Sequence, residues 1–141
     1  MRVLFDTNVI LDVLLARAPH VGPAVALLDR VAGQDLEGLL GATTITTIHY
    51  LATEAVGAAQ AHRHIRTLLG LFEVAPVTRA ALTDALDLGY PDFEDAVLHE
   101  AARHAGARAI VTRDPKGFPK PRLKVYAPDE LLRFIRATPQ R

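Results

Sequence analysis

The residues of this chain best suited to chemistry are three aspartates, Asp6, Asp95 and Asp114. Asp6 directly follows the apolar run 3–5, and Asp114 follows a second such run, 109–111; both runs predict buried strands. Asp95 lies near the start of a segment with helical spacing. A charge at the edge of a hydrophobic core is costly unless something pairs with it, so each of these carboxylates is expected to have a partner.

A shared metal ion is one answer to the question of what pairs with them. In an open α/β sheet, functional groups gather beyond the carboxyl ends of the strands, and helix starts border the same edge. Asp6, Asp95 and Asp114 are therefore expected to meet, and carboxylates held together either bind protons or share a cation. Because the chain has no cysteine and no histidine spacing typical of zinc, hard oxygen ligands favour Mg²⁺ or Mn²⁺. Such sites suit phosphoryl chemistry.

Each aspartate also has a structural interpretation, which the residues alone leave open. Asp6 fits the N-cap of a helix that starts near Asn8. Asp92, with Asp95 three residues later, resembles a capping box. Asp114 precedes a proline and fits a turn.

The polar residues around these aspartates allow two interpretations each. His99 lies one helical turn after Asp95 and either supports it or is an ordinary packed histidine. The threonines of 43–47 either serve only helix entry and packing or also turn one hydroxyl toward the site. The basic group around Asp114 is either a solvated surface or a rim that contacts phosphates, and it consists of Arg113, Lys116, Lys120, Arg122 and Lys124.

Length and composition limit the classes of protein that this chain can be. Its 141 residues, half of them hydrophobic, suffice for one domain with a real core. The formal net charge of zero argues against binding nucleic acid by bulk charge, though not against a local basic patch. No apolar run approaches the roughly 20 residues of a membrane span, and the N-terminus lacks the pattern of a signal peptide. We therefore expect a soluble cytoplasmic protein.

Strand-like and helix-like segments alternate along the chain, which predicts an α/β fold with a mainly parallel sheet and helices on both faces. The predicted strands are 2–5, 38–42, 72–77, 107–112 and 123–126. The predicted helices are 9–16, 23–32, 44–56, 58–69, 79–88, 92–104 and 128–136, with Thr78 capping the fifth. The segment 138–141 is expected to be frayed.

Taken together, the motifs resemble those of PIN-domain ribonucleases, the group that includes the toxins of VapBC-type toxin–antitoxin pairs. The resemblance rests on Asp6-Thr7-Asn8 after the first strand and on Asp92-Phe93-Glu94-Asp95-Ala96 at the start of a late helix. It also rests on Val111-Thr112-Arg113-Asp114 followed by Gly117-Phe118.

The resemblance implies one PIN-like domain over 1–137, folded as a three-layer α/β/α sandwich, with the activity of a metal-dependent endoribonuclease. By motif match, Asp6, Asp95 and Asp114 are the expected ligands of Mg²⁺ or Mn²⁺, and Asp92 the expected holder of a second ion or a bridging water. Asn8 and Thr112 are the expected supports of the ligands, and Arg113 and Lys116 the expected contacts to RNA phosphates.

An antitoxin protein and a homodimer are the partners that the resemblance implies. A basic side chain of the antitoxin would enter the acidic site, since a carboxylate cluster without a cation attracts one. For the dimer, the residues near Leu14, Leu15, Val25 and Leu28 form apolar helix faces that either build an interface or pack into the core.

The chain departs from the family pattern at Thr47, where such proteins commonly carry a glutamate. Glu54 lies about two helical turns further along, too far to replace it. This departure motivates an alternative function, a PIN fold that binds RNA or a protein without cutting. A phosphatase of the haloacid-dehalogenase type is a less favoured alternative, because that class needs a second aspartate where this chain has Asn8.

Overall fold

A five-stranded sheet forms the centre of the computed structural model, which describes residues 1–138. Its strands are β1 (Arg2–Phe5), β2 (Glu37–Gly41), β3 (Glu73–Ala75), β4 (Ala109–Val111) and β5 (Lys124–Tyr126). They lie in the order β3-β2-β1-β4-β5, and every pair of neighbours is parallel. The predicted parallel sheet is thus confirmed, although β3 is shorter than predicted, since Pro76 lacks the N–H that would continue the ladder.

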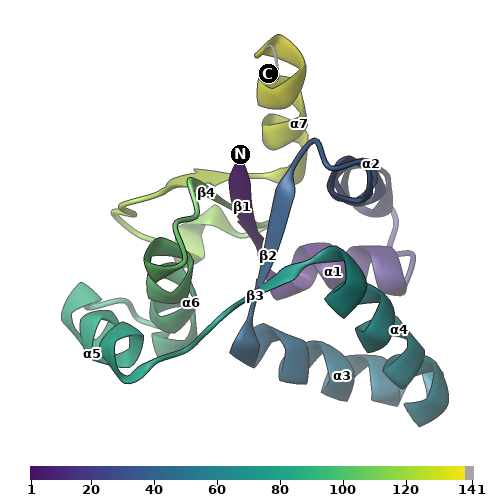
Figure 1. Cartoon of the computed structure of the whole chain (residues 1–141), viewed down its shortest axis with the longest axis horizontal. Helices are drawn as coiled ribbons and strands as arrows, with labels where there is room; N and C mark the ends of the chain where they lie inside the picture. The colour runs from purple at the N-terminus through teal and green to yellow at the C-terminus, as the bar shows by residue number, and fades with distance from the viewer. Residues whose placement is uncertain (139–141) are drawn as a thin grey trace.

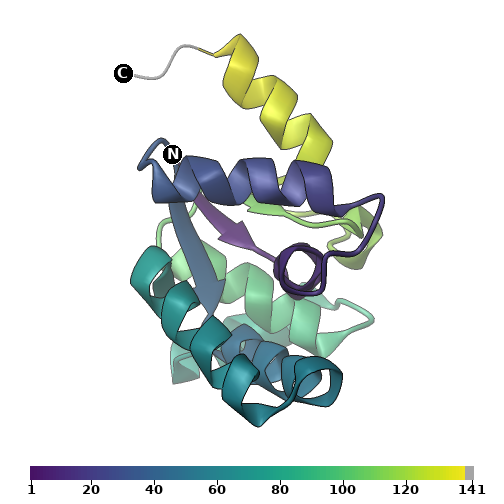
Figure 2. The ribbon, with the colours of Figure 1, turned by 90° about the vertical axis from the view of Figure 1, so that its right-hand side faces the viewer.

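Helices cover both faces of this sheet, as the α/β prediction requires (Figures 1 and 2). They are α1 (Thr7–Leu14), α2 (Val21–Ala32), α3 (Ala42–Val56), α4 (Ala58–Leu71), α5 (Arg79–Leu88), α6 (Phe93–His104) and α7 (Pro128–Ala137), with a short 3₁₀ turn, η1 (Pro115–Gly117). In Figure 1 α5 and α6 lie on one side of the strands, and α1 to α4 lie on the other. The three-layer sandwich is confirmed.

Alternation along the strands divides the core between the two faces. On β1, Val3 and Phe5 pack into the cluster shared with α1, α2 and α4, whereas Leu4 packs into the cluster shared with α6. All three side chains are fully buried. A strand buried on both faces reads as a continuous apolar run, which is typical of parallel sheets, and this explains why 3–5 could be recognised as a strand.

Capping explains where the helix boundaries agree with the predictions and where they move. The Thr78 hydroxyl accepts the N–H of Ala81, and α5 covers the predicted 79–88. Helix α1 begins at Thr7, earlier than predicted, because Asp6 is its N-cap. Helix α2 begins at Val21, so Pro23 lies in its first turn, where a missing N–H costs no intrahelical bond.

The residues named for a dimer surface are partly exposed. Leu14, Leu15 and Leu28 are half-buried and pack against the larger core cluster, and Val25 is 38% exposed. At the other end of the chain, the backbone N–H of Thr138 bonds back to α7; the rest of the predicted frayed tail, 139–141, lies outside the described residues. None of the helices in residues 1–138 has the length and hydropathy to cross a membrane.

A buried ion pair fastens α1 to the segment that follows β4. Asp12 is fully buried on α1, and its carboxylate accepts hydrogen bonds from both Arg17 and Arg113. The Nε of Arg17 lies 2.9 Å from Asp12 Oδ1, and Nη2 of Arg113 lies 3.1 Å from the same oxygen. Since Arg113 directly precedes Asp114, this ion pair fixes α1 relative to a residue of the predicted site.

Replacing Asp12 with asparagine should destabilise the fold. The variant leaves two guanidinium groups without their counter-charge, and because both are partly exposed we expect a loss of about 2 kcal/mol in the free energy of unfolding, less than a fully buried pair would cost. Denaturant unfolding measures it. Asp35→Asn, which removes an exposed partner 3.6 Å from Arg30, serves as the control and should cost less than about 0.5 kcal/mol. Equal losses in the two variants would show that the ion pair of Asp12 with its two arginines stabilises the fold no more than an exposed pair does.

Candidate active site

Strand pairing brings the first two parts of the candidate site together. Strands β1 and β4 are neighbours, with Phe5 opposite Val111, and the backbone N–H of Asp6 extends the ladder to the carbonyl of Val111 at 3.0 Å. The residues that follow the two strands, Asp6 and Thr112, are therefore adjacent. The Thr112 hydroxyl donates to Asp6 Oδ2 at 2.8 Å.

The buried Thr112 hydroxyl organises the polar groups at this edge of the sheet. Besides donating to Asp6, it accepts the N–H of Asp114 at 3.0 Å and the side-chain amide of Asn8 at 3.3 Å. Asn8 Oδ1 in turn accepts the N–H of Arg113. Asn8 and Thr112, predicted from the motifs as supports, thus hold Asp6 and the backbone of Asp114 in place.

Asp6 caps a helix, and its surroundings still disfavour its charged form. Its Oδ1 accepts the N–H of Thr7 at 2.8 Å, so the predicted N-cap is confirmed. Burial raises the pKa of Asp6, and the hydrogen bonds from Thr112 and Thr7 only partly oppose this, while the charges of Asp114 and Asp92 raise it further. Capping and a second role are compatible, because each oxygen of Asp6 still has a free lone pair.

Asp92 and Asp95 reach the site from the start of α6. Asp92 is the N-cap, with Oδ1 accepting the N–H of Glu94 at 2.8 Å and that of Asp95 at 3.4 Å. Within residues 1–138, Asp95 makes no return bond, so this is half of the predicted capping box. Burial, and then the charges of Asp92, Asp6 and Asp114, raise the pKa of Asp95 to about 6. The three predicted ligands and Asp92 therefore lie close enough to repel one another.

Gly117 shows how tightly Asp95 and Asp114 are placed. A Cβ on this glycine would lie 2.8 Å from Asp95 Oδ2 and 3.5 Å from Asp114 Oδ2. The turn η1 therefore passes directly against both carboxylates, which a side chain would prevent. Sequence reasoning included Gly117 in the motif without assigning it a function, because closeness across the fold leaves no local pattern.

A pocket opens in front of Asp6 and Asp95, and of its lining residues only Leu98 was not singled out from the sequence. Its walls are formed by Asp6, Thr7, Thr43, Thr44, Thr47, Glu94, Asp95 and Leu98. Thr47, where the resemblance leads one to expect a glutamate, lies in this wall, and its hydroxyl donates to the carbonyl of Thr43 at 3.2 Å. Helix α3 thus contributes hydroxyl groups to the pocket and no carboxylate.

The two basic residues predicted to contact RNA are in different situations. Lys116 is exposed in η1 and has no partner among the described residues. The guanidinium of Arg113 is bound to Asp12, a residue that sequence reasoning missed, although a lone aspartate inside an apolar helical segment was the available signal. A phosphate contact by Arg113 is thus limited to the part of its guanidinium that Asp12 leaves free.

His99 has partners of its own and does not support Asp95. It is fully buried, its Nδ1 lies 2.8 Å from Glu100 Oε2, and its Nε2 accepts the N–H of Arg122 at 3.0 Å. Because Nε2 accepts, the proton of the neutral ring is on Nδ1 and is donated to Glu100. The interpretation of His99 as a packed histidine is therefore the correct one.

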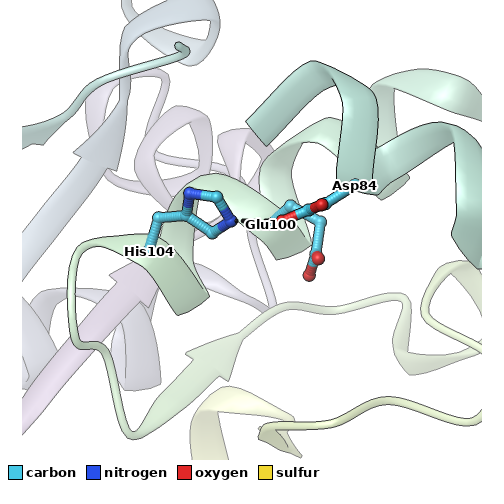
Figure 3. Close-up of side chains that lie close together, drawn as sticks. All are labelled: Asp84, Glu100 and His104. Carbon is cyan, nitrogen blue, oxygen red and sulfur yellow. Dashed lines mark hydrogen bonds and ion pairs between the residues drawn. The ribbon is translucent and has the colours of Figure 1, made fainter. Parts of the chain in front are cut away.

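A second group of possible metal ligands joins α5 to α6 (Figure 3). Ligand atoms of Asp84, Glu100 and His104 all lie within 4.8 Å of one another, a spacing that Asp6, Asp95 and Asp114 do not reach in the part of the chain described. Arg103 Nη2, however, lies 3.1 Å from Asp84 Oδ2 and 3.0 Å from Glu100 Oε1. Burial alone raises the pKa of Glu100, but hydrogen bonds from Arg103 and His99 outweigh it and lower the pKa. This group already contains its cation.

Comparison with known proteins places the chain in a family. Residues 2–116 match the model of the PIN domain. The chain belongs to the PIN-domain family, and the resemblance stated from its motifs is confirmed. That membership also argues against the haloacid-dehalogenase alternative, as do the hydrogen bonds that occupy the Asn8 amide.

Individual relatives of this PIN domain are distant in sequence. Ribonuclease VapC1 of Aquifex aeolicus (strain VF5) is 24% identical over 134 residues, which are 92% of each chain. The VapBC2 structure from Rickettsia felis, bound to a promoter DNA fragment, superposes with a TM-score of 0.70 at 14% identity over 89% of this chain and 97% of that one. The sarcin-ricin loop cleaving toxin VapC20 of Mycobacterium tuberculosis gives 0.66 at 16% identity over 82% and 92%. These likenesses show a shared fold.

Gly117→Ala should disturb the carboxylates of this PIN domain more than its fold. The new Cβ would lie 2.8 Å from Asp95 Oδ2 and displace it, so we expect affinity for Mn²⁺ to fall by about tenfold, roughly 1.4 kcal/mol. Calorimetry measures the affinity. Gly70→Ala, on α4 with no atom within 4 Å of its new Cβ, is the control and should leave affinity unchanged. Unaltered affinity in Gly117→Ala would show that Asp95 binds no metal.

The raised pKa of Asp95 predicts that the contribution of this residue to the stability of metal-free protein falls as pH rises. A folded-state pKa of about 6, above the ordinary 3.8, means that the folded form binds the proton more tightly. The resulting stabilisation is complete below pH 3.8 and is lost as pH rises through 6. After allowance for solvent screening at this partly exposed group, Asp95→Asn should be about 1 kcal/mol more stable than wild type at pH 7.5. Unfolding in EDTA from pH 4 to 7.5 tests this, and an equal gain at every pH would contradict it.

Proposed function

We propose that this PIN domain is a divalent-metal-dependent endoribonuclease whose site is formed by Asp6, Asp95 and Asp114. One observation carries the proposal. In residues 1–138, the two fully buried carboxylates, Asp12 and Glu100, each have an arginine partner. No arginine or lysine among these residues pairs with the aspartates of the site, of which Asp6 and Asp95 are half-buried and Asp114 is exposed. A carboxylate cluster without its own cation favours one from outside.

The donor set fits a hard divalent ion. Asp6, Asp95 and Asp114 offer only carboxylate oxygens, the ligands that Mg²⁺ and Mn²⁺ prefer. Burial first, and then the charges of the neighbouring aspartates, raise the pKa of Asp95 and of Asp6, and a bound cation would favour the charged form of both. Asp92 keeps one oxygen free of its capping bonds and would hold a bridging water or a second ion. The choice between Mg²⁺ and Mn²⁺ is part of this proposal.

Residues of the chain prepare a phosphodiester for hydrolysis. When bound, the ion supplies a coordinated water of lowered pKa and neutralises charge on the phosphate. Thr112 and Thr7 hold Asp6 by hydrogen bonds to both of its oxygens, which fixes the direction of its remaining lone pairs. Lys116, exposed beside Asp114, would bind a phosphate oxygen of the RNA, and the free part of Arg113 would do the same.

The relatives support a place for this protein in a toxin–antitoxin pair. VapC1 is described as a ribonuclease, VapC20 as a toxin that cleaves the sarcin-ricin loop, and a structure from Klebsiella pneumoniae as a toxin-antitoxin complex. By analogy, an antitoxin is the expected partner of this chain, and RNA its substrate. A homodimer is the other expected assembly, and the exposed parts of Leu14, Leu15, Val25 and Leu28 remain available to its interface.

Asp6→Asn should abolish RNA cleavage. Loss of one carboxylate from the metal-binding set should lower the rate at least about 100-fold, roughly 2.7 kcal/mol of transition-state stabilisation. Cleavage of a mixed RNA pool with Mn²⁺ or Mg²⁺, with and without EDTA, measures this. Asp84→Asn is the matched control, because it removes a carboxylate from the group that Arg103 neutralises, and it should cleave as wild type does.

The outcomes separate the candidate functions. Cleavage that survives Asp6→Asn, or that fails in Asp84→Asn instead, would overturn the assignment of the site. Metal binding without cleavage of any RNA would favour the alternative of a non-catalytic PIN fold, as the threonine at position 47 suggests. Retained RNA binding would then distinguish an RNA-binding module from one that binds only protein.

A further inference from the structure

The ion pair at Asp12 presents two arginines to solvent in a fixed arrangement. Arg113 uses Nε and Nη2 to bind Asp12, and Arg17 uses Nε for Asp12 and Nη2 for the carbonyl of Asn8. Within residues 1–138 the Nη1 of each arginine has no protein partner. The side chain of Arg17 is 39% exposed and that of Arg113 is 29% exposed. One aspartate and two arginines leave a net charge of +1 at this point.

This arrangement is suited to binding an anion. Free arginine side chains lose rotamer entropy when they bind a ligand, and here Asp12 has already fixed both. A guanidinium also keeps its planar array of donors when one edge is occupied, so the outer edge stays available to a phosphate.

A pocket with apolar walls lies directly beside Arg113. Its other lining residues are Pro19, His20, Pro23, Ala127, Pro128 and Asp129. The three prolines supply apolar surface, and the His20 imidazole and the Arg113 guanidinium are planar groups of the kind on which an unpaired base stacks. The negative charge of Asp129 is balanced by Arg133, 3.2 Å away.

Hydrogen bonds connect the arginine pair to the acidic site through Asn8. The carbonyl of Asn8 accepts from Arg17, and its Oδ1 accepts the backbone N–H of Arg113. Its amide donates to Thr112, whose hydroxyl holds Asp6. The two features therefore lie at the same edge of the sheet, where one extended strand of nucleic acid can contact both.

We propose that Arg17 and Arg113, fixed by Asp12, bind a phosphate of single-stranded RNA that flanks the cleaved one, and that the adjacent pocket takes the base of that nucleotide. The inference rests on the proposed ribonuclease function and adds Arg17 and the pocket to it. Single-stranded RNA is the substrate class, because a base can enter the pocket only when it is unpaired.

Removal of the Arg17 charge tests the phosphate contact. Binding of a labelled single-stranded RNA is measured by fluorescence anisotropy over a series of salt concentrations, in an Asp6→Asn background that prevents cutting. Arg17→Gln should weaken binding about tenfold at 0.1 M salt and lower the slope of log K against log salt by about 0.7, the value for one phosphate contact on a single strand. Asp12 keeps Arg113 in this variant, so the fold should survive.

Matched variants separate charge from structure. Arg108→Gln removes an exposed arginine directly before β4, at the opposite edge of the sheet, and should bind as the background protein does. Arg17→Lys keeps the charge but has no outer guanidinium edge once its ammonium pairs with Asp12, so its binding should fall between that of the background protein and that of Arg17→Gln. His20→Glu places a negative charge in the pocket without touching Asp12 and should also weaken binding. A duplex of the same sequence should compete at least about tenfold less well than the single strand.

The outcomes also distinguish this inference from the proposed function. In protein with an intact Asp6 and Mn²⁺, Arg17→Gln should raise KM and leave kcat nearly unchanged. Cleavage by wild type together with equal binding by Arg17→Gln and Arg108→Gln would overturn the phosphate contact and leave the ribonuclease in place. Equal competition by duplex RNA would overturn the base pocket. If wild type neither binds nor cuts RNA, both proposals fall.

Discussion

The parallel pairing of β1 with β4 is the constraint on which the rest of the site depends. It places the ends of two strands side by side, although Asp6 and Thr112 are far apart in the sequence. The Thr112 hydroxyl then makes three hydrogen bonds, to Asp6, Asn8 and the backbone of Asp114. A one-residue slip in this register would turn these side chains to the other face of the sheet, so the core residues that fix the register also fix the site.

Repulsion within the site is offset by the ends of helices. Asp6 caps α1 and Asp92 caps α6, so each carboxylate accepts backbone N–H groups that would otherwise lack a partner. The positive end of the helix dipole adds to this stabilisation. The offset is incomplete, because the pKa of Asp6 and of Asp95 remains raised. The fold thus holds carboxylates together at a cost in stability, which is expected where a site is kept for a ligand.

Sequence reasoning recovered the features that have local causes. Strands buried on both faces leave continuous apolar runs, and aspartates directly after such runs lie at a known edge of the sheet, so Asp6 and Asp114 could be found. Thr78 and Asp92 were recognisable as caps because capping follows a spacing of two or three residues. Contacts across the fold were not recoverable. The pairing of Asp12 with Arg113 and the packing of Gly117 against Asp95 join residues whose closeness only the assembled sheet creates.

The two acidic groups of this protein show why geometry alone does not identify a metal site. The ligand atoms of Asp84, Glu100 and His104 lie closer together, yet Arg103 bonds to both carboxylates and offsets one of their two negative charges. The site aspartates are further apart and have no cation of their own among the described residues. A carboxylate group that has an arginine within it contributes to stability, here by joining α5 to α6. Carboxylates that the fold brings together without such a partner favour a cation from outside, and our proposal that Asp6, Asp95 and Asp114 form the metal site rests on that distinction.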